Sequence, residues 1–246
     1  MRWVVKWQLF GILILIFGDL VGDEEDLINL SNDSGPVFVS LGCNCDVAEE
    51  MRNNQLRKGA FPFDWLCTFN PDSIKDLLDD DFQFFLDKQC LLQYPIPINS
   101  NQAVNLYYDI EFTHDNLPLD RWEEWEVQST LSKFERRINR FRNLRQYPGK
   151  VIFIRSSYNF KSFGMSHFQK EWWVMPTKKI SSKQIQELKN ALDRYFPDLD
   201  FILVMVNYTE ESLLPEEIPG VLEFKMNRYY RVDYYREMFK TLNLSQ

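Results

Sequence analysis

The stretch VFVSLGCNCDVAEEM, residues 37–51, decides the fold prediction because it contains a change of secondary structure. Residues 36–42 form an apolar run, which is typical of a strand buried on both faces of a sheet. Residues 45–58 have the apolar spacing of an amphipathic helix. Cys43 and Cys45 lie at the junction. The stretch therefore predicts a buried strand, a turn with two thiols, and a helix.

The rest of the chain repeats this strand and helix pattern. Further apolar runs lie at residues 151–157, 201–207 and 221–226. Helical patterns lie at residues 71–80, 118–144, 181–196 and 232–242. Continuous apolar runs separated by helices are typical of a parallel sheet that is covered on both faces. We therefore expect a single α/β domain over residues 36–246, with a mainly parallel sheet flanked by helices in three layers.

Two segments between these elements have weaker patterns. Residues 103–115 alternate well enough to predict one strand, and the prolines in residues 81–102 indicate an irregular surface segment.

Composition excludes some classes of function. The formal net charge is -8, and the isoelectric point is near 5.0. Nucleic-acid binding normally needs a basic face, so we expect no nucleic-acid partner. The chain has no G-x-G-x-x-G fingerprint and no Walker loop. The sequence therefore gives no support for nucleotide binding, and we predict no cofactor.

The N-terminus has the pattern of a targeting segment. Residues 1–22 combine Arg2 and Lys6 with an apolar run, which predicts a signal peptide or a retained signal-anchor. Residues 23–35 form a polar, acidic linker. We expect a secreted or endomembrane-lumenal protein, with a membrane contact only if the segment stays as an anchor. The glycosylation candidates are Asn29, Asn32, Asn207 and Asn243.

The four cysteines allow two interpretations that involve no catalysis. In a secreted chain, Cys43 and Cys45 would each form a disulfide with Cys67 or Cys90. A zinc site is disfavoured because Cys67, Cys90 and His114 lack any familiar ligand spacing. We therefore predict no metal, and the disulfide alternative stays open.

A third interpretation makes Cys45 a nucleophile. A thiol at a helix N-terminus faces unpaired N–H groups and the positive end of the helix dipole, which favour the thiolate. The N–H of Cys45 or of a close neighbour would stabilise an oxyanion. His114, next to Asp115, is the candidate base, and His167 is the weaker choice.

Two residues at the end of another predicted strand are candidates for lining the site. Arg155 and Ser156 close the apolar run 151–157, and ligands of such folds gather at the carboxyl ends of the strands.

Residues 37–66 resemble a family catalogued as a domain of unknown function and described as papain-like cysteine peptidases. The matching motifs are S-L-G-x-x-C, which ends at Cys45, and FPFDW, residues 61–65; FTHD, residues 112–115, is similar to the family's histidine motif. The resemblance implies Cys45 as nucleophile and His114 as base. It also implies a papain-like α+β fold as the alternative architecture. Asp64 would either orient His114 or tie two loops together.

We therefore expect a thiol-dependent hydrolase or acyltransferase, with Asp115 or Asp64 orienting the base and a peptide, acyl or glycan substrate that the sequence does not identify. The first alternative is a non-catalytic, disulfide-stabilised binding module for glycans. Its stacking surfaces would come from Trp122, Trp125, Trp172 and Trp173. The second alternative is a carbohydrate-modifying enzyme that uses Asp64 and Asp115.

Overall fold

The computed structural model describes most of the chain from residue 35 onward. The described residues are 35–43, 45–68, 70–93, 103–115, 117–157, 180–208, 211–226 and 231–244. Apart from Gly35, the predicted leader and linker lie outside these residues. Within the described part, no helix is long and apolar enough to cross a membrane.

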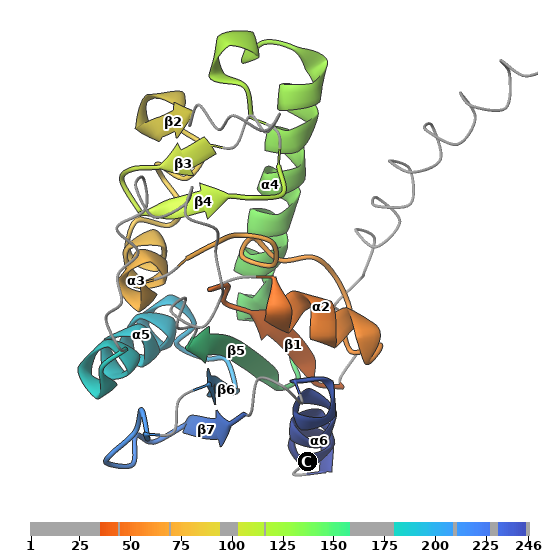
Figure 1. Cartoon of the computed structure of the whole chain (residues 1–246), viewed down its shortest axis with the longest axis vertical. Helices are drawn as coiled ribbons and strands as arrows, with labels where there is room; N and C mark the ends of the chain where they lie inside the picture. Colours follow the sequence, from red (N-terminus) through yellow and green to blue (C-terminus); the bar gives the residue numbers. More distant parts are fainter. Residues whose placement is uncertain are drawn as a thin grey trace, which may run out of the picture.

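A four-stranded parallel sheet forms the centre of the molecule (Figure 1). Its strands lie in the order β1 (Val37–Ser40), β5 (Val151–Ser157), β6 (Phe201–Asn207) and β7 (Val221–Lys225). All three strand pairings are parallel. The prediction of a mainly parallel α/β sheet is confirmed, and the four strands match the four apolar runs.

Both faces of this sheet are buried, which explains why its strands are continuously apolar. On one face, Val39 and Phe153 pack with α3 (Pro71–Asp79), α4 (Trp125–Asn143) and α5 (Ser182–Tyr195). On the other face, strand residues pack with α2 (Asp46–Asn53) and α6 (Arg231–Leu244). The strands therefore form the middle of three layers, with α2 and α6 on one side (Figure 1).

Local sequence signals fix where two of the helices begin. Asn70 caps α3 by accepting from the backbone N–H of Asp72, and Pro71 occupies the first helical turn. Ser181 and Gln184 form a reciprocal capping box at the start of α5.

A second sheet is antiparallel, and the sequence analysis did not predict it. It consists of β2 (Leu91–Gln93), β3 (Ala103–Asn105) and β4 (Ile110–Phe112). The prediction of one strand over residues 103–115 was wrong, because a turn divides that segment and Asp109 has a φ of 55°. β2 lies in the segment predicted to be irregular.

α4 connects the two sheets. It begins at Trp125 rather than near residue 118, after the short 3-10 helix Leu119–Arg121. Two further short 3-10 helices span Lys88–Cys90 and Leu144–Gln146. Figure 1 shows α4 running from the antiparallel sheet to the parallel sheet.

Candidate functional site

The turn after β1 carries both cysteines of the S-L-G-x-x-C motif; we call residues 40–43 and 45 the thiol turn. Gly42 and Cys43 both have positive φ, at 76° and 82°. The N–H of Gly42 donates to Ser40 Oγ at 3.1 Å, and the N–H of Cys43 donates to Thr68 Oγ1 at 2.8 Å. A Cβ on residue 42 would lie 2.5 Å from Thr68 Oγ1, so a glycine is required there.

The two thiols of this turn differ in access to solvent. Cys43 is only 1% exposed and lies in the core. Cys45 is half-buried and is the N-cap residue of α2, where its carbonyl accepts from the N–H of Glu49 at 2.9 Å. Cys45 is therefore the more accessible cysteine of this pair. The acidic side chains of Asp46 and Glu49 in the first turn of α2 act against a thiolate there.

Arg155 lies behind the thiol turn and is fully buried. Its Nη1 donates to the carbonyl of Leu41 at 2.8 Å and to Thr68 Oγ1 at 3.0 Å, and its Nη2 donates to the carbonyl of Thr68. Burial lowers the pKa of the guanidinium, and nearby Cys43 and Asp72 act in the opposite sense.

The prediction that Arg155 and Ser156 line the site was wrong about access. Ser156 is also fully buried, and its hydroxyl has no hydrogen-bond partner within the described residues. The physical reason is that both residues lie inside a strand with covered faces, rather than beyond its end.

Residues 65–68 connect the thiol turn to the candidate histidine. Thr68 contacts the thiol turn, and Cys67 pairs with Glu111 of β4 in an isolated antiparallel bridge. Trp65 accepts at its carbonyl from Thr113 Oγ1 at 3.2 Å, and its ring lies 5.7 Å from that of His114. This short segment therefore brings the end of β4 and the thiol turn to one region.

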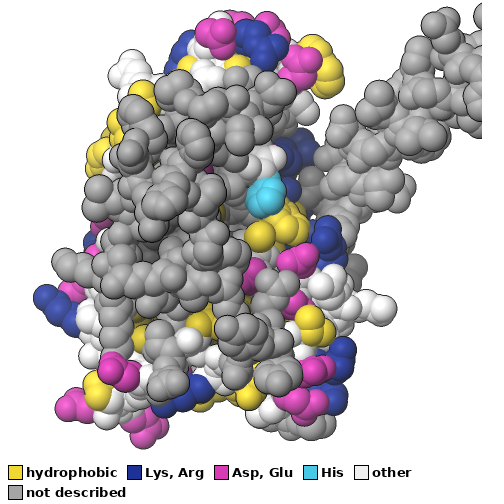
Figure 2. Space-filling model, viewed as in Figure 1, with side chains coloured by type: hydrophobic (Ala, Val, Ile, Leu, Met, Phe, Trp, Pro, Cys, Tyr) yellow, Lys and Arg dark blue, Asp and Glu magenta, His cyan; other side chains and the backbone are white. Residues whose placement is uncertain are grey.

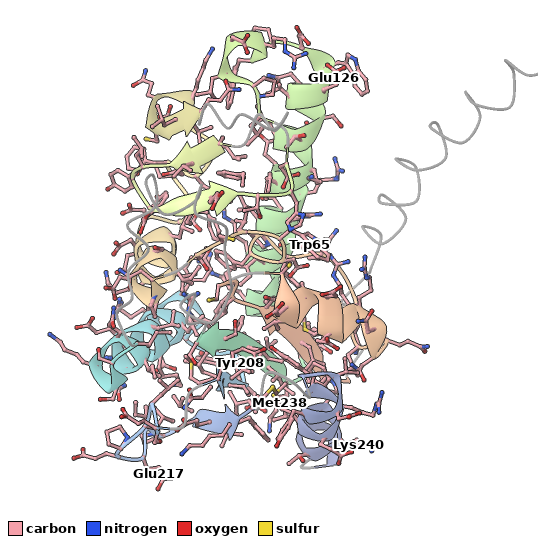
Figure 3. The ribbon with its side chains drawn as sticks, in the orientation of Figure 1. Trp65, Glu126, Tyr208, Glu217, Met238 and Lys240 are labelled. Atoms are coloured by element: carbon pink, nitrogen blue, oxygen red, sulfur yellow. The ribbon has the colours of Figure 1, made fainter. Side chains whose placement is uncertain are left out.

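His114 is exposed at the end of β4. Figure 2 shows the histidine at the surface, beside hydrophobic side chains, and Figure 3 labels Trp65 next to α2 and α4. Trp65 also contacts the guanidinium groups of Arg52 and Arg57, at 5.5 and 5.7 Å from its ring centroid. The imidazole therefore rests against an aromatic ring that is itself held in place.

Neither carboxylate predicted to orient His114 contacts it in this structure. Asp115 pairs with Lys133 of α4. Asp64 pairs with Arg57 at 2.8 Å and accepts from the N–H of Phe61 at 3.0 Å. Within the described residues, His114 has its ring contact with Trp65 and no hydrogen bond. For Asp64, the structure matches the alternative role, because this carboxylate ties the FPFDW turn to Arg57.

Two groups on the bridge between residues 67 and 111 have shifted pKa values. Burial raises the pKa of the Glu111 carboxyl to about 7. Burial, together with the charge of Glu111, also raises the pKa of the Cys67 thiol, although a hydrogen bond with Thr113 acts in the opposite sense. The raised pKa keeps Cys67 as a neutral thiol near Cys45.

The disulfide candidates do not form bridges here. None of the four cysteines is in a disulfide, the candidates Cys43, Cys67 and Cys90 included. Among the described residues, no group of three or more His, Cys, Asp or Glu side chains is arranged to hold a metal ion.

One glycosylation candidate is contradicted. Asn207 is fully buried, and its amide nitrogen donates to the carbonyl of Glu211 at 2.7 Å and to Glu223 Oε1 at 2.5 Å. A folded chain does not offer this nitrogen to a glycan. Asn29 and Asn32 lie outside the described residues, as does the side chain of Asn243.

The tryptophans predicted to stack on glycans do not share one environment. Trp125 is 74% exposed at the start of α4, whereas Trp122 is partly buried and lies under Lys88. Trp172, Trp173 and the second histidine, His167, lie outside the described residues.

The sequence analysis missed two residues that shape this site, Thr68 and Trp65. Both lie in or just after the FPFDW motif, so their proximity to the motif was the available signal. Their contacts depend on segments far away in the chain, which periodicity does not reveal.

Comparison with known proteins gives three findings. A family model described as "Putative papain-like cysteine peptidase (DUF1796)" matches residues 36–211. "Uncharacterized protein R408" of Acanthamoeba polyphaga mimivirus is 25% identical over 205 residues, which cover 74% of this chain and 82% of the viral protein. No solved structure matches the chain.

Proposed function

The chain belongs to the family described as "Putative papain-like cysteine peptidase", and on this premise we propose that it is a thiol-dependent hydrolase or acyltransferase with Cys45 as nucleophile. The observation that carries the proposal is the half-buried thiol of Cys45 at the first turn of α2, beyond the carboxyl end of β1. Ligands of parallel α/β folds bind at this edge of the sheet. A helix N-terminus also favours the thiolate, which is the reactive form.

The chemistry is acyl transfer through a thioester. The Cys45 thiolate attacks a carbonyl carbon, and the electron pair of the carbonyl bond moves to its oxygen. Collapse of this intermediate expels the leaving group, which takes a proton from the imidazolium of His114. Water or another acceptor then attacks the thioester while neutral His114 takes its proton, and Cys45 leaves as the thiolate.

The developing oxyanion needs N–H donors that have no other acceptor. The N–H groups of Gly42 and Cys43 are already bound by the hydroxyls of Ser40 and Thr68. The first N–H groups of a helix have no acceptor within the helix, so the first turn of α2 is the better source.

The assignment of His114 as base rests on the contacts of residues 65–68. These residues touch the thiol turn through Thr68 and the imidazole through Trp65. As general base, the imidazole would take up the proton of the Cys45 thiol.

Replacement of Cys45 by Ala tests the proposal. We expect hydrolysis of an activated acyl ester to fall by about a thousandfold or more. The matched control is Cys90→Ala, because Cys90 is also a half-buried free thiol but lies at the antiparallel sheet. A Cys45→Ala protein that keeps full activity would contradict the proposal.

We further propose that the chain enters the secretory route through residues 1–22. The basic and apolar pattern of this segment and the sequons at Asn29 and Asn32 support this. N-terminal sequencing of the mature protein, before and after removal of N-glycans, tests it; an intact N-terminus on a soluble, unglycosylated cytosolic protein would contradict it.

A further inference from the structure

The most unusual group in the core is the guanidinium of Arg155. It is fully buried in the centre of the molecule, on the face of β5 that packs against α3, α4 and α5. Within the described residues it forms no ion pair, and its Nε has no hydrogen-bond partner. Burial of a charge among neutral acceptors is costly, and an apolar side chain of similar volume would cost less. A role in stability alone therefore explains this residue poorly.

Within the part of the chain that the structure describes, the acceptors of Arg155 belong to the thiol turn or to Thr68, which holds it. One is the carbonyl of Leu41, which comes directly before the turn's two left-handed residues. The others are the carbonyl and the hydroxyl of Thr68. The planar fork of an arginine can reach several fixed acceptors at once, and a lysine ammonium cannot reproduce that geometry.

Thr68, held by Arg155, in turn restrains the backbone of the thiol turn. Its Oγ1 accepts from the N–H of Cys43 at 2.8 Å, and its own N–H donates to the carbonyl of Cys43 at 3.4 Å. The same Oγ1 occupies the space that a side chain on Gly42 would need. Left-handed backbone at a non-glycine residue persists only where the surroundings enforce it, and Thr68 enforces it at Cys43.

We propose that Arg155 is a positioning residue of the thiol site: through Thr68 it fixes Gly42 and Cys43 in the left-handed conformation that delivers Cys45 to the first turn of α2. The inference rests on the proposed function of Cys45. In this proposal Arg155 holds the backbone of the thiol turn in place, whereas Cys45 and His114 carry out the chemistry. The positive charge of Arg155 next to Cys43 also favours negative charge in the thiol turn.

The test is the reactivity of Cys45, which needs no substrate. Full-length protein is treated with iodoacetamide from pH 5 to pH 9, and mass spectrometry follows alkylation of each cysteine. The variants are Arg155→Lys, Thr68→Val and Thr68→Ser. Val removes the hydroxyl at nearly constant shape, whereas Ser restores it. Arg140→Lys is the matched control, because Arg140 is also a buried arginine that donates to a backbone carbonyl, that of Ala60.

We expect Arg155→Lys and Thr68→Val to slow alkylation of Cys45 at pH 6.5 by roughly tenfold to a hundredfold and to displace its pH profile upward. Thr68→Ser and Arg140→Lys should keep the wild-type profile. A merely structural role would lower the melting temperature without displacing the pH profile of the folded protein. If Arg155→Lys does not fold, the comparison of Thr68→Val with Thr68→Ser tests the proposal in its place.

Two failures can be told apart. If wild-type Cys45 reacts no faster than Cys90 at pH 6.5, the proposed function fails and the inference fails with it. If wild-type Cys45 is reactive and folded Thr68→Val keeps the same profile, the proposed function stands and the role of Arg155 is refuted.

Discussion

Glu111 is a carboxyl group buried on β4 opposite Cys67, and its titration has a predictable effect on stability. Burial raises its pKa from an ordinary value of 4.5 to about 7, so the folded protein holds this proton more tightly than the unfolded chain does. The resulting stabilisation is fully present below about pH 4.5 and is lost as the pH rises through about 7.

Glu111→Gln should therefore stabilise the protein at alkaline pH, because the amide stays neutral. We expect its free energy of unfolding to exceed that of the wild type by about 2 to 3 kcal/mol at pH 8, and the difference to shrink at pH 5. Urea unfolding of both proteins at the two pH values measures this. The same difference at pH 5 and pH 8 would show that Glu111 does not titrate in this range.

Asp64 forms a buried ion pair with Arg57, and the loss of one partner should be costly. Their side chains are 0% and 6% exposed, so Asp64→Ala removes a buried negative charge from beside the Arg57 guanidinium. We expect a loss of about 3 to 5 kcal/mol in the free energy of unfolding by urea. The matched control is Asp76→Ala, because the Asp76 side chain is 48% exposed and its partner Lys75 is only half-buried; this change should cost less than about 1 kcal/mol. Equal losses in the two variants would contradict the account.

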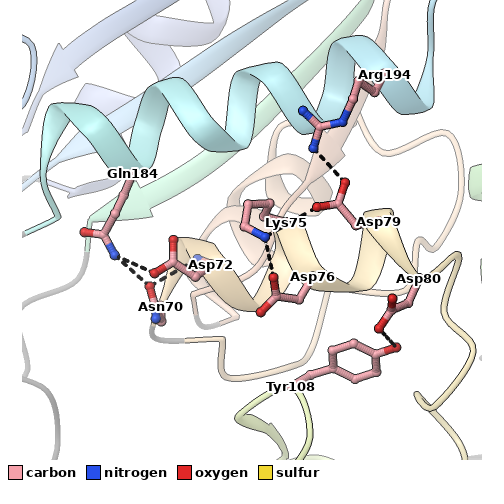
Figure 4. A network of polar contacts seen from close by, with 9 residues as sticks. All are labelled: Asn70, Asp72, Lys75, Asp76, Asp79, Asp80, Tyr108, Gln184 and Arg194. Atoms are coloured by element: carbon pink, nitrogen blue, oxygen red, sulfur yellow. Dashed lines mark hydrogen bonds and ion pairs between the residues drawn. The ribbon is translucent and has the colours of Figure 1, made fainter.

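At the scale of elements, α3 and α5 are joined by polar contacts at both ends (Figure 4). Gln184 Nε2 donates to Asn70 Oδ1 at 2.9 Å and to Asp72 Oδ2 at 3.0 Å. At the other end, Arg194 pairs with Asp79 at 2.7 Å. The contacts of Gln184 lie next to the segment that leads from Thr68 into α3.

Gln184→Glu should weaken this junction more than loss of the α5 cap does. The carboxylate cannot donate, and it places a negative charge against Asp72, so we expect a loss of about 1 to 3 kcal/mol at pH 7. Ser181→Ala removes the cap alone and should cost about 1 kcal/mol. Thermal unfolding of the two variants gives the comparison. A Gln184→Glu protein as stable as the wild type would show that the junction contributes little.

The elements that could be predicted are those whose signal is local. β1, β5, β6 and β7 are continuous apolar runs, and the start of α5 is encoded by Ser181 and Gln184. β2, β3 and β4 have three residues each, which is too short for periodicity to separate them from loops. The turn between β3 and β4 ends at Asp109, which is left-handed although it is not a glycine, so no glycine marks this turn in the sequence.

The candidate site likewise has some features that the local sequence predicts and others that it does not. The place of Cys45 at a strand-to-helix junction follows from neighbouring residues, so it could be predicted. The pairing of Asp115 with Lys133, and the clamp of Arg155 on Leu41, join residues far apart in the chain. Such contacts depend on tertiary packing, which explains why the sequence did not reveal the partners of Asp115 and Arg155.

At the scale of the whole molecule, the two sheets should differ in local stability. β5 and β6 are interior strands with a neighbour on each side, and β5 is buried along its whole length. β2, β3 and β4 are shorter, and the turn between β3 and β4 exposes Leu106 and Tyr107. Local opening costs less where fewer apolar contacts are lost.

Hydrogen exchange followed by mass spectrometry should therefore find the slowest amides in β5 and β6. Amides of β2 to β4 should exchange faster, and those of the edge strand β7 should lie between. Equal protection of both sheets would mean that they unfold as one cooperative unit.

The central claim is that Cys45 is the reactive thiol of this fold, and a cysteine-by-cysteine alkylation map of the unreduced, full-length protein tests it most directly. The account predicts that Cys45 alone is labelled rapidly by iodoacetamide below pH 7, with buried Cys43 and neutral Cys67 protected. Recovery of Cys45 in a disulfide with Cys67 or Cys90, or labelling of Cys45 no faster than of Cys90, would contradict it.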